Sequence, residues 1–154
     1  MYGQSRITTN ATVTAPTTFA IGQITGALGN GLRFSVEEEE MFTKLEFQAS
    51  MAHSVAAEPF DATFFVDGVD VGDLVDGITR ATSLDVPADP IAFYMKKTVR
   101  LAQGEHKLEV LFKTAAGNVI VNGLLHPAAL SATRMSSNAA VAANMTSKQV
   151  TGGY

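Results

Sequence analysis

Four aspartates occur at every third position, and their carboxylates could bind a metal ion. They are Asp67, Asp70, Asp73 and Asp76. Calcium prefers carboxylate oxygens, but the common calcium loop takes ligands at alternate positions and closes with a glutamate, and this spacing does not match it. The solvated turn of a hairpin accounts for the same residues, so we expect no metal ion here.

A run of four glutamates, from Glu37 to Glu40, offers a second set of carboxylates. One of them could form half of the acid–base pair of a glycosidase, although the partner of such a pair cannot be identified from sequence. Adjacent carboxylates repel one another, so a solvated loop is the ordinary interpretation. A charged patch that meets a basic partner is the alternative.

The three histidines, His53, His106 and His126, are too far apart in the sequence to form a short-spaced metal motif. The chain has no cysteine to complete a zinc site. Gly26, Gly29 and Gly31 do not match a dinucleotide- or phosphate-binding loop, and no nucleophile elbow is present. We therefore expect a protein that is not an enzyme, with no catalytic residue, no metal and no cofactor.

The elements that must position these residues are expected to be β-strands. The stretch from Lys97 to Met135 is divided by glycines into three or four antiparallel strands. In one of them an apolar face alternates with a polar face, and the apolar face comprises His106, Leu108, Val110, Phe112 and Thr114. His106 is therefore expected to be a hydrogen-bonded core or interface residue.

Further strands are indicated upstream of this stretch. Leu45, Phe47, Ala49 and Met51 alternate with polar residues, and Phe19–Thr25 and Leu32–Val36 also favour strands. The dipeptide Asp67-Gly68 indicates a hairpin with a type I′ turn. About eight short strands with turns between them predict an all-β fold, a jelly-roll-like antiparallel sandwich with extended N- and C-terminal arms.

The ends of the chain define the expected domain organisation. Residues 1–18 and 137–154 are rich in small and polar residues and carry too little apolar surface to fold alone. We expect residues 1–18 to form an N-terminal arm, residues 19–136 the β-sandwich body and residues 137–154 a C-terminal arm.

Charge and hydropathy exclude several classes of partner. The net charge of −4 leaves no basic stripe to neutralise phosphates, so we expect no nucleic-acid partner. No run of 18 apolar residues is present, so we expect no membrane partner, and residues 1–10 lack the apolar core of a secretory signal.

The segment Val99–Val110, VRLAQGEHKLEV, resembles a pattern of jelly-roll and TNF-like virion proteins, in which a strand ends at a glycine turn and a "G-x-H-x-hydrophobic" strand follows. Ala129–Arg134 is similar to the final strands of those proteins. The resemblance covers about a third of the chain. It implies a tailed-bacteriophage structural protein, such as a capsid decoration or cement protein or a fibre-head domain. The same turn pattern occurs in carbohydrate-binding sandwiches.

These observations lead to one expected function and two alternatives. We expect a non-enzymatic structural protein of a viral particle, a capsid decoration or cement protein that stabilises the shell by bridging neighbouring subunits. The alternatives are a glycan-binding fibre or appendage domain, which the absence of Trp weakens, and a small enzyme with a sandwich fold.

The expected partners follow from this function. They are the major capsid protein or other virion subunits, and a second copy of the chain in a homo-oligomer such as a trimer. The chain would be made in the host cytoplasm and reside in the assembled particle. Residue type and position indicate five interface anchors in the arms, namely Tyr2, Arg6, Ile7, Val150 and Tyr154.

Overall fold

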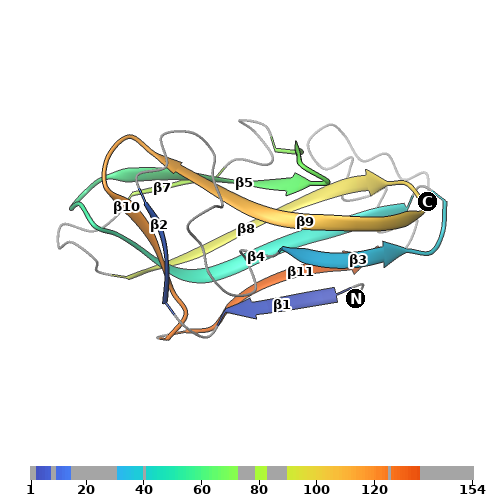
Figure 1. Ribbon diagram of the computed structural model, residues 1–154, viewed down its shortest axis with the longest axis horizontal. Helices are drawn as coiled ribbons and strands as arrows, with labels where there is room; N and C mark the ends of the chain where they lie inside the picture. The colour runs from blue at the N-terminus through green and yellow to red at the C-terminus, as the bar shows by residue number, and fades with distance from the viewer. Residues whose placement is uncertain are drawn as a thin grey trace, which may run out of the picture.

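The computed structural model describes residues 3–7, 10–14, 31–39, 41–72, 79–82, 90–124 and 126–135. Every regular element in these residues is a β-strand, and the strands form two antiparallel sheets that pack face to face (Figure 1). Sheet A contains β1 (Gly3–Ile7), β2 (Asn10–Thr14), β4 (Met41–His53), β8 (Ile91–Leu101), β10 (Asn118–Asn122) and β11 (Ala128–Arg134). Sheet B contains β3 (Leu32–Val36), β5 (Pro59–Val66), β6 (Val69–Asp70), β7 (Thr79–Thr82) and β9 (Gly104–Thr114).

The long strand β4 organises sheet A. One side of β4 pairs with the whole length of β8, from Met41 to Met51. The other side pairs first with β11 and then with β10, so these two short strands together occupy one position in the sheet. β1 pairs with β11 and β2 pairs with β10, so they form the next position in the same way. Sheet A is therefore equivalent to four long strands.

Sheet B has the same construction. β9 lies between β3 and β5, and the other side of β5 pairs with β7 near its start and with β6 near its end. Two sheets, each equivalent to four antiparallel strands, have the strand number and layering of a jelly roll. The sequence-based expectation of an all-β, jelly-roll-like antiparallel sandwich is confirmed.

The core lies between the sheets and is built from the apolar faces of alternating strands. In β3, Leu32, Phe34 and Val36 are buried whereas Arg33 and Ser35 are exposed. Four phenylalanines, Phe47, Phe60, Phe64 and Phe112, are at most 1% exposed. Burying one such side chain contributes about 1.5–3 kcal/mol, so this layer provides much of the driving force for packing the sheets.

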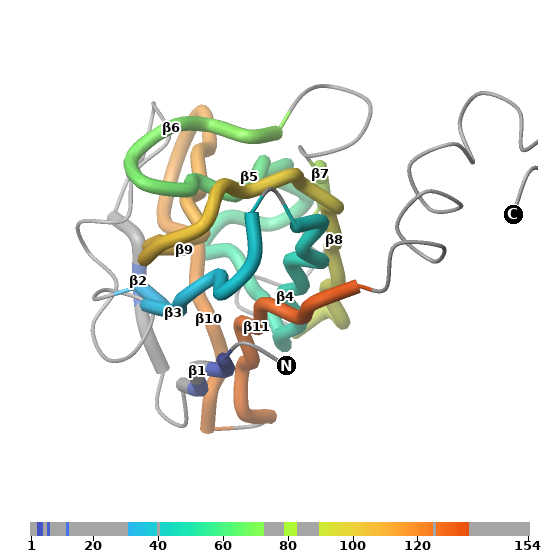
Figure 2. Tube along the Cα trace, turned by 90° about the vertical axis from the view of Figure 1, so that its right-hand side faces the viewer, coloured from blue at the N-terminus to red at the C-terminus, as the bar shows by residue number. Residues whose placement is uncertain are grey.

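The N-terminal residues require a correction to the expected domain organisation. Gly3–Ile7 and Asn10–Thr14 are extended, but they pair with β11 and β10 of their own chain rather than extending outside the body. A segment with little apolar surface can still form an edge strand, because an edge strand needs a hydrogen-bonding partner on one side only. Figure 2 shows β1 beside β11. The expected strand Phe19–Thr25 and the expected arm at residues 137–154 lie outside the described residues.

The turn between β5 and β6 has the expected geometry. Asp67 has φ of 53° and Gly68 has φ of 80°. Positive φ at both central residues is the signature of a type I′ turn, whose twist matches that of the flanking strands. The prediction of a hairpin at Asp67-Gly68 is confirmed.

Candidate functional site

The aspartates at this hairpin make hydrogen bonds within the fold. The Oδ1 of Asp67 accepts the backbone N–H of Lys107 at 2.8 Å, and its Oδ2 lies 2.7 Å from Nδ1 of His106. Asp70 accepts the hydroxyl of Thr63 at 2.8 Å and the N–H of Gly72 at 2.9 Å. Asp73 and Asp76 lie outside the described residues. Asp67 and Asp70 thus fasten β6 and the turn to the rest of sheet B.

His106 is half-buried and contacts two acceptors. Its Nδ1 donates to Asp67, and its Nε2 donates to the carbonyl of Ala102 at 2.7 Å. Burial disfavours the charged ring, but the bonds to Ala102 and to the Asp67 carboxylate outweigh burial and raise the pKa of His106. In turn, burial opposes ionisation of Asp67, but the bonds from His106 and from the N–H of Lys107, together with the charge of His106, outweigh it and lower the pKa of Asp67. The expectation that His106 is a hydrogen-bonded residue is confirmed.

His53, at the end of β4, is fully buried. Its Nδ1 accepts the N–H of Val55 at 3.0 Å, which places the ring proton on Nε2. Nε2 then donates to Oγ1 of Thr114 at 3.0 Å, and this hydroxyl donates to the carbonyl of Pro59 at 2.9 Å. Burial lowers the pKa of His53, in agreement with a neutral ring. This chain of hydrogen bonds joins the ends of β4, β5 and β9.

The acidic run follows β3 as a loop, as expected. Glu37, Glu38 and Glu39 are exposed, and Glu40 lies outside the described residues. The carboxylate of Glu38 lies 2.6 Å from the guanidinium of Arg134, so one member of the run ties this loop to the end of β11. Among the described residues no group of three His, Asp or Glu side chains is placed to hold a metal ion.

The structure describes two of the five expected anchors. Arg6 is exposed on β1, and Ile7 pairs with Ala128 at the end of the same strand. A Cβ added to Gly3 would lie 3.2 Å from a methyl group of the buried Leu32, so Gly3 faces the core and Arg6, three residues later, faces outward. Tyr2, Val150 and Tyr154 lie outside the described residues. The role of these five residues in partner contacts stays a prediction.

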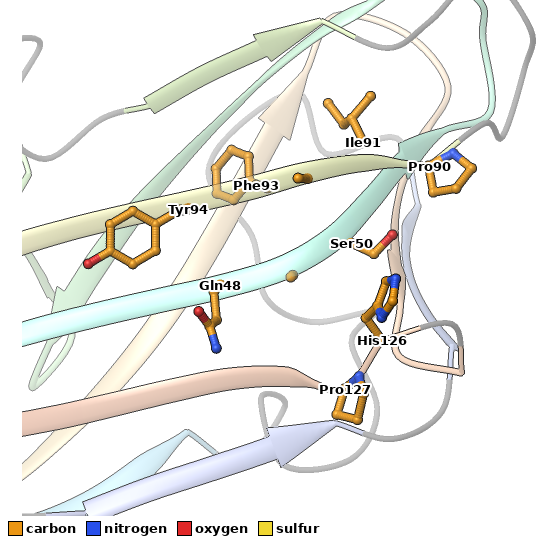
Figure 3. A pocket seen from close by; sticks show the side chains of 10 residues that line it. Gln48, Ser50, Pro90, Ile91, Phe93, Tyr94, His126 and Pro127 are labelled. Atoms are coloured by element: carbon orange, nitrogen blue, oxygen red, sulfur yellow. The ribbon is translucent and has the colours of Figure 1, made fainter.

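The candidate functional site is a shallow depression on the outer face of sheet A, which sequence analysis did not identify (Figure 3). It has a volume of about 620 Å³, which lies in the range of about 300–1,000 Å³ that is typical of ligand sites. Its lining comes from β4, from the first residues of β8 and from the turn that precedes β11, and includes Gln48, Ser50, Pro90, Ala92, Tyr94, His126 and Pro127.

Strand register explains why the surface is hollow at this point. Gln48 lies opposite Tyr94 on β8 and opposite Ala129 on β11, while Ser50 lies opposite Ala92. The small side chains of Ser50 and Ala92 project only a short way from the outer face of the sheet, so the surface is depressed between the larger side chains around them. Tyr94 stands on one side of this low area and His126 with Pro127 on the other, as Figure 3 shows. The result is a trough that crosses two strands and has a rim of rings.

Tyr94 is held in place by a neighbouring carboxylate. Its side chain is 49% exposed, and its hydroxyl donates to Oε2 of Glu46 at 2.5 Å. Glu46 in turn lies 3.2 Å from the ammonium of Lys44. The bond to Glu46 raises the pKa of Tyr94 to about 12, and the same bond is the main cause of the lowered pKa of Glu46. The phenol is therefore neutral at physiological pH, and the bond to Glu46 favours this orientation of its ring.

The arrangement is suited to binding. The trough offers an amide, a hydroxyl and an imidazole as hydrogen-bonding groups, beside the rings of one tyrosine and two prolines. Alternation in β8 could have placed Tyr94 on the outer face, since Phe93 and Met95 face the core. The positions of Gln48 beside Tyr94 and of His126 across the trough depend on pairings between distant segments, which leave no local signal in the sequence.

Comparison with known proteins finds no protein-family model that matches the chain and no similar sequence among curated proteins. Solved structures with related architecture do exist. A TNF of S. frugiperda, Eiger, has a TM-score of 0.46 and 8% identity, over 86% of this chain and 92% of that one. A family 35 carbohydrate-binding module from an environmental isolate has a TM-score of 0.40 and 12% identity, over 80% and 82% of the two chains.

The insecticidal delta-endotoxin Cry8Ea1 of Bacillus thuringiensis has a TM-score of 0.43 and 10% identity over 85% of this chain, which spans only 19% of the endotoxin. None of these three is a protein of a viral particle, and likenesses this distant assign no function.

In the described part of the chain no helix has the length and hydropathy needed to cross a bilayer.

Proposed function

We propose that the chain is a non-enzymatic structural protein of a bacteriophage particle, which decorates or cements the capsid shell by bridging neighbouring subunits. The observation that carries the proposal is the position of the N-terminal residues. β1 and β2 form the outermost position of sheet A, and among the described strands they pair on one side only. An outermost strand of this kind presents backbone donors and acceptors to a neighbouring chain.

The construction of the body supports the same role. Two of the three histidines and Asp67 brace the sandwich, through His53 with Thr114 and His106 with Asp67. Jelly rolls occur in viral capsid proteins and in lectins, which makes the fold compatible with the proposal by analogy. Many weak contacts made by repeated copies on one particle add up through effective concentration.

The exposed guanidinium of Arg6 lies on this outermost strand, facing outward. Aromatic and arginine side chains dominate the energetics of protein interfaces. We propose that Arg6 is one anchor of the contact with the major capsid protein or with a second copy of the chain. An oligomer such as a trimer would use the same edge.

A binding experiment with particles tests the proposal. Particles are purified from the source of the chain, stripped of loosely held proteins and incubated with the full-length protein, and co-sedimentation is measured. We expect Arg6→Glu to weaken binding by about tenfold, because it reverses the charge of an interface arginine. Arg33→Glu is the matched control, because Arg33 is exposed on β3 of the other sheet.

Two results would contradict the proposal. One is that the unmodified chain fails to sediment with the particles at any concentration used. The other is that both charge reversals reduce binding equally, which would indicate nonspecific attraction by net charge rather than a contact at the edge of sheet A.

A further inference from the structure

We propose that the trough on the outer face of sheet A binds a neutral carbohydrate, with one pyranose ring stacked on the ring of Tyr94. This inference goes beyond the structural role and does not rest on it. The structural role does not require such a site, whereas a glycan-binding appendage domain would need one. The argument uses only the shape, the charge and the hydrogen-bonding groups of the trough.

The first step is the mixed character of the lining. A pyranose ring has an apolar face of C–H groups and an edge of hydroxyl groups that both donate and accept hydrogen bonds. The trough presents matching surfaces, the half-exposed ring of Tyr94 for the face and the side chains of Gln48, Ser50 and His126 for the edge. Amide and hydroxyl groups donate and accept at once, as sugar hydroxyls require.

The second step is charge. Among the described residues that line the trough, none is a Lys, Arg, Asp or Glu. The nearest carboxylate along β4, Glu46, is already engaged by the hydroxyl of Tyr94 and by Lys44. A charged ligand would lose its hydration on binding, and the described lining has no opposite charge to compensate for that loss. A neutral ligand therefore fits best.

The third step separates a sugar from a peptide. Extended peptides are commonly bound by adding a strand to a free sheet edge. The trough lies on the outer face of β4 and β8, which pair with each other from Met41 to Met51 and from Ile91 to Leu101. Backbone N–H and C=O groups lie in the plane of a sheet and side chains project from its face, so a ligand on this face is recognised by side chains. This favours a ligand rich in hydroxyl groups.

The fourth step is preorganisation. A ring that is already fixed loses little conformational freedom when a ligand stacks on it. The hydroxyl of Tyr94 donates to Glu46, and Glu46 contacts Lys44, so these contacts favour one orientation of the ring before the ligand arrives. The proline rings at positions 90 and 127 add two further rigid surfaces to the rim.

Saturation-transfer NMR and a glycan array on the full-length protein test the inference. The probes are neutral oligosaccharides built from glucose, galactose, mannose and N-acetylhexosamines, with sialylated and sulfated glycans and a set of short peptides as competing classes. We expect binding of at least one neutral oligosaccharide, with saturation transferred mainly to the C–H face of one ring.

Three variants locate the site. Tyr94→Ala and Gln48→Ala are each expected to weaken binding by about tenfold, as is usual for truncating a central contact. Tyr94→Phe keeps the ring and should retain binding within about threefold, because it loses only the bond to Glu46. Val69→Ala is the control, because Val69 is 63% exposed on β6 of the other sheet, and it should leave binding unchanged.

Several results would overturn the inference. They are the absence of transfer to every neutral oligosaccharide at millimolar concentration, a preference for anionic glycans or peptides, and equal binding by the protein and by Tyr94→Ala. Circular dichroism of each variant excludes loss of fold as the cause of lost binding, and Gln48→Ala decides the matter if Tyr94→Ala does not fold. Sugar binding by a protein that never joins particles would refute the structural role alone.

Discussion

Two buried threonines provide a matched pair of substitutions with opposite expected effects. Thr114 is 5% exposed, accepts a hydrogen bond from His53 and donates one to the carbonyl of Pro59. Thr43 is fully buried on β4, and its hydroxyl has no hydrogen-bond partner in the described structure. Replacing threonine by valine removes the hydroxyl and keeps the β-branched shape, so the two variants differ only in the partners that are lost.

The magnitudes follow from these partners. In Thr114→Val the Nε2–H of buried His53 and the carbonyl of Pro59 both lose a partner, and leaving a buried polar group unsatisfied costs about 1–3 kcal/mol. We expect the free energy of unfolding to fall by about 2–3 kcal/mol. In Thr43→Val an unpaired buried hydroxyl disappears, and we expect a gain of about 1 kcal/mol.

The assay is urea unfolding followed by far-ultraviolet circular dichroism, because the chain contains no tryptophan to report by fluorescence. For a chain of this length 1 kcal/mol corresponds to about 2–4 °C in melting temperature, so a thermal scan resolves both changes. The reasoning is refuted if both variants shift stability in the same direction, or if Thr114→Val changes it by less than the fitting error.

Three further predictions concern a turn, an ion pair and the core. Gly117→Ala should destabilise the protein by more than about 2 kcal/mol, because the added Cβ would lie 2.8 Å from the ring of His53. Gly68 has a similar positive φ but open space around it, so Gly68→Ala should cost about 1 kcal/mol. Equal urea midpoints for the two variants would count against the argument. Asp67→Asn keeps the acceptor for Lys107 but removes the ion pair with His106. The advantage of the natural chain should be about 0.5–1 kcal/mol between pH of about 4, where Asp67 is ionised, and pH of about 6.5. It should disappear as pH rises through the raised pKa of His106, so an advantage that grows with pH above about 6.5 would contradict the argument. Phe112→Ala should cost about 3–5 kcal/mol in the same unfolding assay, and a loss under about 1 kcal/mol would show that the core is misplaced.

The strands with two-residue alternation could be predicted from sequence. Leu108, Val110 and Phe112 on β9 and Leu45 and Phe47 on β4 all face the core, as their spacing indicated. The turn at Asp67-Gly68 could also be predicted, because few other residue pairs adopt positive φ at both positions. Both features depend on residues that are close in the sequence, so local patterns were sufficient to predict them.

The first strands were not recognised as part of the body, for a physical reason. β1 and β2 have few apolar residues, and their hydrogen-bonding partners lie more than a hundred residues later in β10 and β11. Such a segment resembles a free arm when it is considered alone. Its place in sheet A is determined by pairing across the whole chain, which no local pattern encodes.

The trough was missed for a related reason. Tyr94 could have been placed on an outer face by alternation, but the residue beside it could not. Gln48 becomes its neighbour through the register of β4 and β8, and His126 arrives through the pairing of β11 with the other side of β4. A surface site built from three distant segments follows from topology.

The most direct test of the structural role is quantitative mass spectrometry of gradient-purified particles from the source of the chain. A decoration or cement protein should be present at a copy number of the same order as the major shell protein and should remain through a wash at moderate salt. The proposal is contradicted if the chain is absent from the particles while it is abundant in the soluble fraction of the same lysate.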